Sequence, residues 1–119
     1  MSMYNKVKGT RFETQLEDYL NDAGVSARRL PRAGTKDIGD VSISVKNFAI
    51  IIEAKNVKKQ EMADFLRQAD VESCNYELKY GTPTVPIVVT KTRGKKAGEA
   101  RVTMTLDTLL DLLRLGGVT

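Results

Sequence analysis

The stretch from Phe48 to Lys55 is the feature of this sequence that most constrains its fold. Five apolar residues, Phe-Ala-Ile-Ile-Ile, are followed by Glu53, Ala54 and Lys55. A short apolar run rich in β-branched side chains predicts a strand buried on both faces. Because strand side chains alternate, Glu53 and Lys55 point to the same face. A carboxylate and an ammonium group at the end of a buried strand are costly unless they are paired or used.

Periodicity and turn residues predict the other elements. Helices are expected over residues 7–22 and 59–79, strands over 25–30, 41–45, 48–55, 85–90 and 102–106, and a last helix, capped by Asp107, through Leu115. Lys46 and Asn47 suit a turn, so strands 41–45 and 48–55 form a β-hairpin. This α-β-β-β-α-β-β-α order predicts an α/β fold with a mixed β-sheet flanked by helices. A chain of 119 residues fits a single domain over residues 1–119.

Two residue types limit the chemistry that the chain can perform. Histidine is absent, and Cys74 is the single cysteine. The absence of histidine excludes a Ser-His-Asp triad, histidine acid–base chemistry and His-rich zinc sites. One thiol forms neither an internal disulfide nor a multi-thiolate zinc site. Carboxylates, lysine and a hard metal ion remain as the tools for catalysis.

The charge pattern favours a polyanionic partner. The net charge is +4. Residues 24–36 carry four basic side chains and no acidic one, and residues 91–101 carry five basic side chains against Glu99. Basic blocks around acidic residues suit a protein that holds a phosphate backbone and places a metal against it, although ordinary surface lysines explain the charge equally well.

No apolar run reaches the roughly 20 residues that cross a bilayer. The polar N-terminal segment has no signal region, so a cytoplasmic protein without membrane contact is expected.

Asp40 joins the pair on the buried strand. It immediately precedes Val41, and the hairpin folds the start of one strand beside the end of the next, so Asp40 should lie near residues 53–55. Two carboxylates this close repel unless a divalent cation lies between them. Lys55 would then orient or deprotonate the attacking water, or offset charge on a phosphate. The alternative is a simple Glu53–Lys55 salt bridge. Asp37 is expected to stabilise the loop instead.

Glu13 is the fourth candidate. On a helical wheel it lies at the edge of the apolar stripe of the first helix, so a helix packed on the sheet would bring it toward the metal. The alternative is an exposed helical glutamate. Glu17, one turn later, is expected to be solvated.

The pattern Glu13, Gly39-Asp40-Val41 and Ile52-Glu53-Ala54-Lys55 resembles the PD-(D/E)xK nuclease superfamily. Lys8-Gly9-Thr10-Arg11-Phe12-Glu13 at the first helix resembles, more narrowly, the archaeal-type Holliday junction resolvases. The resemblance implies a restriction-endonuclease-like core. Gly39 stands where the superfamily name has proline.

The resemblance also implies roles for individual residues. Asp40 and Glu53 would bind the metal with the backbone carbonyl of Ala54, Glu13 would support the metal directly or through water, and Lys55 would be the catalytic lysine. The implied cofactor is Mg2+, with Mn2+ as an alternative. Candidate DNA-binding residues are Lys6, Lys8, Arg11, Arg29, Arg32, Thr35, Lys36, Lys91, Arg93, Lys95 and Lys96.

The implied function is a hydrolase of DNA recombination, a magnesium-dependent endonuclease that resolves four-way junctions by paired cuts as a homodimer. The candidate interface residues are Leu109, Leu110, Leu112, Leu113, Leu115, Phe65 and Tyr76. Two alternatives stay open: another PD-(D/E)xK nuclease, nicking or restriction-like, and a non-cleaving nucleic-acid-binding subunit.

Overall fold

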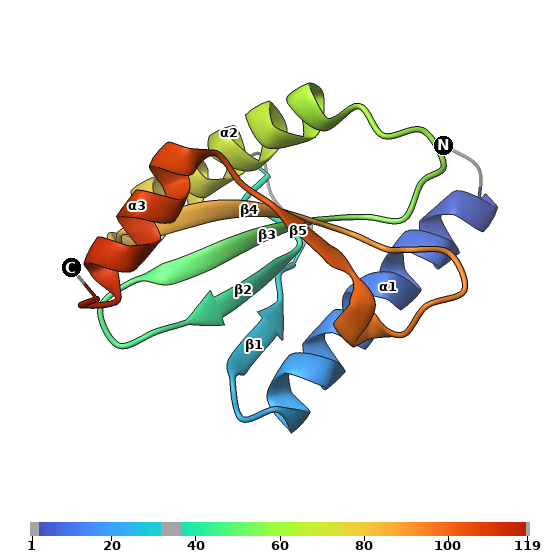
Figure 1. The fold of residues 1–119 in the computed structure, drawn as a ribbon, viewed down its shortest axis with the longest axis horizontal. Helices are drawn as coiled ribbons and strands as arrows, with labels where there is room; N and C mark the ends of the chain where they lie inside the picture. The colour runs from blue at the N-terminus through green and yellow to red at the C-terminus, as the bar shows by residue number, and fades with distance from the viewer. Residues whose placement is uncertain (1–2, 32–36, 119) are drawn as a thin grey trace.

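The computed structural model describes residues 3–31 and 37–118, with side chains from residue 7 onward (Figure 1). The elements are α1 (Met3–Asp22), β1 (Ser26–Arg29), β2 (Val41–Ser44), β3 (Ala49–Lys55), α2 (Met62–Tyr80), β4 (Thr84–Thr90), the 3-10 helix η1 (Ala97–Glu99), β5 (Arg101–Thr103) and α3 (Leu106–Leu115). The predicted order of helices and strands is confirmed. The main shifts are at helix starts, because α1 begins four residues earlier than expected and α2 three residues later.

The described strands form one sheet in the order β1-β2-β3-β4-β5. The predicted hairpin is present, since β2 and β3 are antiparallel with Val41 opposite Ile52. The β3 strand then runs parallel to β4, with α2 as the crossover between them, and Ile52 lies opposite Ile87. The sheet is therefore mixed, and β3 and β4 are buried at its centre.

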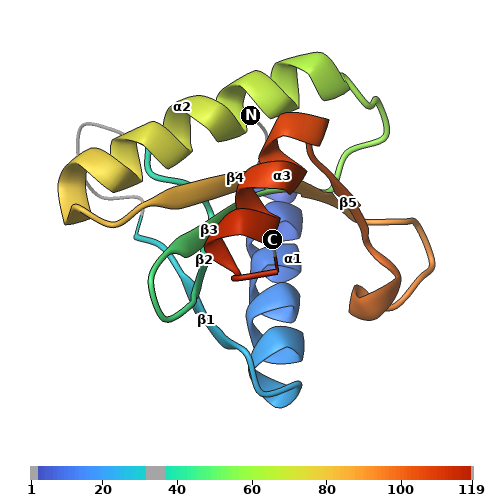
Figure 2. The same cartoon turned by 60° about the vertical axis from the view of Figure 1, so that its left-hand side comes forward.

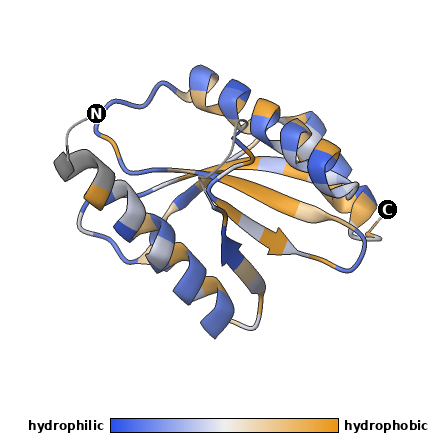
Figure 3. Ribbon diagram, turned by 180° about the vertical axis from the view of Figure 1, so that it is seen from behind, coloured by the Kyte–Doolittle hydropathy of each residue, from blue (hydrophilic) through white to orange (hydrophobic). Residues whose placement is uncertain are grey.

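Each face of β3 packs against a different helix. Ile52 packs with Phe12 and Leu16 of α1, whereas Ile51 packs with Tyr76 of α2. Figure 2 shows α1 and α2 on opposite sides of the sheet, and Figure 3 shows apolar residues concentrated on the central strands. Because side chains alternate along β3, the odd-numbered residues after Ile51 also face α2.

The C-terminal part of the chain is less buried than its alternating apolar residues predict. The β5 strand ends at Thr103, so the predicted strand to residue 106 is too long. Val102 is 54% exposed and Leu106 is 71% exposed, because β5 is an edge strand and α3 covers little of the sheet. The predicted cap of α3 is also corrected, since Thr105 rather than Asp107 caps it, accepting a hydrogen bond from the Thr108 N–H at 3.1 Å.

One aromatic side chain of α1 remains half exposed. Tyr19 is 50% exposed and lies against Gly98 of η1. In the described ranges, no helix is both long and apolar enough to cross a bilayer.

Candidate active site

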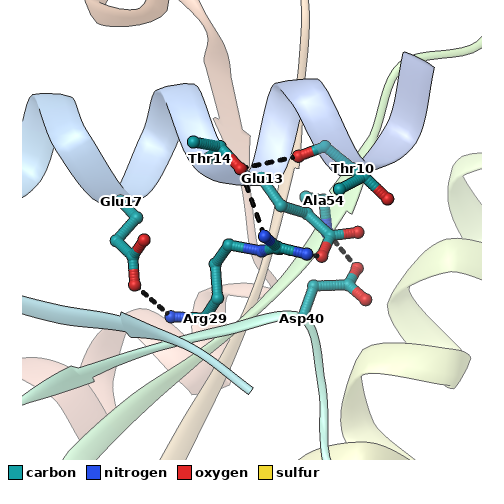
Figure 4. Close-up of polar contacts among 7 residues, drawn as sticks. All are labelled: Thr10, Glu13, Thr14, Glu17, Arg29, Asp40 and Ala54. Carbon is teal, nitrogen blue, oxygen red and sulfur yellow. Dashed lines mark hydrogen bonds and ion pairs between the residues drawn. The ribbon is translucent and has the colours of Figure 1, made fainter. Parts of the chain in front are cut away.

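The start of β2 holds Asp40 beside β3, as the hairpin geometry predicts. The backbone N–H of Asp40 donates to the carbonyl of Ile52 at 3.0 Å. The N–H of Ala54 donates in turn to Oδ2 of Asp40 at 2.8 Å (Figure 4). Since Val41 is also paired with Ile52, the ladder is irregular at Asp40, and such irregularities redirect a side chain. The Ala54 N–H therefore fixes the orientation of a carboxylate that the core encloses.

Gly39 makes this turn possible. Its φ angle is +106°, and a Cβ atom at this position would lie 2.5 Å from Cγ2 of Ile51. Proline, with φ fixed near −65°, cannot adopt this conformation, which explains physically why glycine precedes Asp40 here. Asp37 supports the same turn, because its Oδ1 accepts a hydrogen bond from the Gly39 N–H at 3.0 Å. The predicted loop role of Asp37 is thus found.

Glu53 lies on the α2 face of β3 and is 3% exposed. Its Oε2 atom is buried, and no group of the described residues forms a hydrogen bond with it. Burial, followed by contacts with the carboxyl groups of Asp40 and Glu72, raises the pKa of Glu53 to about 12. In the absence of a cation, this carboxyl group therefore keeps its proton.

Glu72 is the acidic residue that sequence reasoning missed. It is 2% exposed in the middle of α2, and its carboxyl group interacts with those of Glu53 and Asp37. Burial is the main cause that raises the pKa of Glu72 to about 8. A sequence signal existed, because Phe65, Ala69, Glu72 and Tyr76 follow helical spacing and are all buried.

Lys55 ends β3 on the same face as Glu53 and is half-buried. Its Nζ atom lies 5.1 Å from the centroid of the Phe65 ring, a cation–π contact with α2. Within the described part of the chain, no ion pair joins Lys55 to Glu53. The alternative of a simple salt bridge between these two residues is therefore not observed.

Glu13 is buried on the α1 side and is 2% exposed. Its Oε1 atom lies 3.8 Å from Nε of Arg29, a residue of β1. Nη1 of Arg29 also donates to Oγ1 of Thr14 at 3.3 Å. In Figure 4 the carboxylates of Glu13 and Asp40 point toward the same region. The structure thus places Glu13 inside the protein, not on an exposed helix face.

Glu17 and Arg29 differ from what the sequence suggests. Glu17 is half-buried instead of fully solvated, and its Oε2 accepts a hydrogen bond from the Arg29 N–H at 2.7 Å. It fastens the edge strand β1 to α1. Arg29 was grouped with the DNA-binding residues, yet its guanidinium already pairs with Glu13.

The other candidate DNA-binding residues fall into two groups. Arg11 is exposed and Lys8 is half-buried on α1, and the rest of the described set follows β4, where Lys91 is half-buried and Arg93, Lys95 and Lys96 are exposed. The Lys91 N–H donates to the carbonyl of Lys55 at 3.0 Å, so the basic loop starts at the end of β3. Arg32, Thr35, Lys36 and the side chain of Lys6 lie outside the described residues.

The donor set fits a hard divalent cation. Asp40 and Glu53 are buried, interacting carboxyl groups, and one oxygen of Glu53 is without a hydrogen bond among the described residues. No three acidic side chains of the described residues converge on one point, but Mg2+ is commonly bound by one or two carboxylates plus water and phosphate oxygens. The predicted ligands therefore suit Mg2+ once a phosphate is present.

Comparison with known proteins adds a family to this geometry. The family model of the archaeal Holliday junction resolvases (Hjc) matches residues 4–108, which include Glu13, Asp40, Glu53 and Lys55. The chain belongs to the archaeal Holliday junction resolvase family. A resolvase of this family is a nuclease that hydrolyses DNA at four-way junctions, so this is the activity of the chain.

A solved structure agrees with the family. Hjc, a Holliday junction resolvase from the archaeal hyperthermophile Archaeoglobus fulgidus, matches with a TM-score of 0.52 and 25% sequence identity, over 77% of this chain and 72% of that chain. The curated proteins give no match. The α/β architecture of this resolvase, a mixed sheet with flanking helices, is similar to that of Hjc.

Proposed function

We propose that this resolvase cleaves four-way DNA junctions with Mg2+ bound at Asp40 and Glu53, with Mn2+ as a substitute, and that it acts as a homodimer. The observation that carries the metal proposal is the buried Asp40–Glu53 pair, whose repulsion a divalent cation would remove. The carbonyl of Ala54 would be a further ligand. Glu13 would bind directly or through water.

The chain's own residues would then divide the work of hydrolysis. The Ala54 N–H holds one oxygen of Asp40, which keeps that carboxylate oriented before DNA arrives. Mg2+, when bound, supplies positive charge that activates water and stabilises the negative charge developing on the phosphate. Lys55 would orient or deprotonate the attacking water, or offset charge on the phosphate.

The basic residues would hold the DNA backbone. Lys8 and Arg11 lie on α1, and the loop that starts at Lys91 begins beside Lys55. Contacts of lysine and arginine with phosphates position DNA without reading its sequence. This mode of binding suits an enzyme that selects DNA by its branched shape.

The dimer proposal rests on α3 and on the need for two cuts. In the described residues, α3 has no buried side chain, and Leu109 and Leu110 are each 38% exposed. A second copy of the chain would cover this apolar face and supply the second active site. Phe65 and Tyr76, also predicted at the interface, are instead buried in the core of this chain.

The test is a cleavage panel with Mg2+ and without it. A four-way junction, a replication fork, linear duplex and single strands should be compared at equal concentration. We expect preferential, Mg2+-dependent cutting of the junction at paired positions. Equal cutting of linear duplex would favour another PD-(D/E)xK nuclease, and binding without cutting would favour a non-cleaving subunit.

Sedimentation tests the dimer separately. We expect dimers at micromolar protein concentration, and a double substitution of Leu109 and Leu110 by lysine should produce monomers. A wild-type chain that sediments as a monomer would contradict paired cutting by a preformed dimer.

A further inference from the structure

Glu72 is the buried acidic side chain that the proposed mechanism does not use. It lies in the centre of α2, more than nine-tenths buried, and its Oε1 atom has no hydrogen-bond partner among the described residues. A buried carboxyl oxygen without a partner costs free energy. Because its carboxyl group interacts with that of Glu53, this buried oxygen lies at the candidate active site.

The side chains around Glu72 are either acidic or form only a long hydrogen bond with it. Its carboxyl group interacts with Glu53 on one side and with Asp37 on the other. Gln68, one helical turn earlier, donates to Oε2 at 3.4 Å, which is a long hydrogen bond. No lysine or arginine of the described residues forms an ion pair with Glu72. Among the described residues, the carboxyl group of Glu72 therefore has no cationic side chain as a partner.

We propose that Glu72 is a further cation-binding residue of the active site, which supplies a third carboxylate beside Asp40 and Glu53 and so raises the affinity for the divalent cation. This inference rests on the proposed function, since it concerns the same cation. The three groups do not converge on one point in the described structure, so Glu72 reaches the cation through a water molecule or after a side-chain rotation. Additional carboxylates generally raise the affinity of oxygen-ligand sites.

The inference is tested by cation binding without DNA. Metal-free protein is titrated with Mg2+ or Mn2+ in a calorimeter. We expect Glu72→Gln, which keeps the shape of the side chain, to weaken binding by about tenfold or more. Asp70→Asn is the matched control, because Asp70 is exposed on the same helix and its substitution removes the same charge. The control should bind the cation as the wild type does.

Two further measurements keep the test decisive. Glu72→Asp keeps the charge but shortens the side chain, and we expect an affinity between those of wild type and Glu72→Gln. The rise in Tm caused by saturating Mg2+ should be smaller for Glu72→Gln than for wild type, with far-UV circular dichroism confirming that each variant folds.

The outcomes separate this inference from the proposed function. Cation binding by wild type that Glu72→Gln leaves unchanged would overturn the role of Glu72 and leave the Asp40–Glu53 site intact. No cation binding by wild type, together with cleavage that does not need Mg2+, would overturn the proposed metal site and this inference with it.

Discussion

Buried carboxyl groups on the two sides of the sheet have partners of opposite charge. On the α1 side, Glu13 lies 3.8 Å from the guanidinium of Arg29. On the α2 side, Glu53 is as deeply buried, but its partners are the carboxyl groups of Asp40 and Glu72. Paired with a guanidinium, a buried carboxylate remains charged without help, whereas among other carboxylates it must bind a proton or a cation. The proposed cation would therefore bind beside Glu53, where neighbouring carboxyl groups raise the cost of a negative charge.

The largest effect is expected from removing the two carboxyl groups that would bind the proposed cation. Asp40→Asn or Glu53→Ala should reduce junction cleavage by about 10³-fold, because charge on the reacting phosphate loses its stabilisation. Junction binding, measured by gel mobility shift, should change little. Cleavage at the wild-type rate by both variants would sink the assignment of the site.

The stability of the metal-free protein should fall as the pH rises. The pKa of Glu53 is raised from 4.5 to about 12 in the folded chain, so folded protein retains a proton that the unfolded chain releases. The stabilisation is complete below pH 4.5, and it decreases by about 1 kcal/mol per pH unit above this value. Glu72, with its pKa raised to about 8, adds to the loss up to that pH.

Urea unfolding between pH 5 and pH 8, with a metal chelator present, measures this slope. Glu53→Gln should reduce the slope, since an amide does not titrate, and the part of the slope due to Glu72 should remain. Saturating Mg2+ should also reduce the slope for wild type. A flat profile for metal-free wild type would contradict the raised pKa of Glu53 and Glu72.

A smaller effect is expected from the turn that presents Asp40. Gly39→Ala should destabilise the fold by about 3 kcal/mol, because the new Cβ adds a clash with Ile51 to the strain of a positive φ. Gly24→Ala is the matched control, since Gly24 also has a positive φ of +88° but has no atom within 4 Å of the built Cβ. It should cost about 1 kcal/mol. Equal losses of unfolding free energy would contradict the close contact at Gly39.

The smallest effect on unfolding free energy is expected from a substitution on the α1 side of the sheet. Arg29→Met removes the cation beside Glu13 and should cost about 1–2 kcal/mol in unfolding free energy, because the guanidinium is partly exposed and the pair is long. Arg28→Met, at the exposed neighbouring position on β1, should change stability by less than about 0.5 kcal/mol. If Arg29→Met and Arg28→Met lower the unfolding free energy equally, the Glu13–Arg29 ion pair does not distinguish the α1 side of the sheet from the α2 side.

Much of the site could be predicted because its members are close in sequence or joined by a short hairpin. Alternation along one strand puts Glu53 and Lys55 on the same face, and a tight turn brings Asp40 beside them. The strand positions were accurate in the buried centre of the sheet. They failed at β5, because an apolar alternation indicates a strand but does not show whether anything covers it.

By itself, the sequence determined the order of the elements, the face shared by Glu53 and Lys55, and the oxygen-rich, histidine-free chemistry of the site. Only the tertiary structure decided which partner each buried carboxylate has. Glu72 and Glu53 are 19 positions apart in the sequence, and Glu13 and Arg29 are 16 apart, so their contacts depend on how α2 and α1 pack on the sheet. The charge of a buried group is set by such neighbours, and local sequence periodicity contains no information about them.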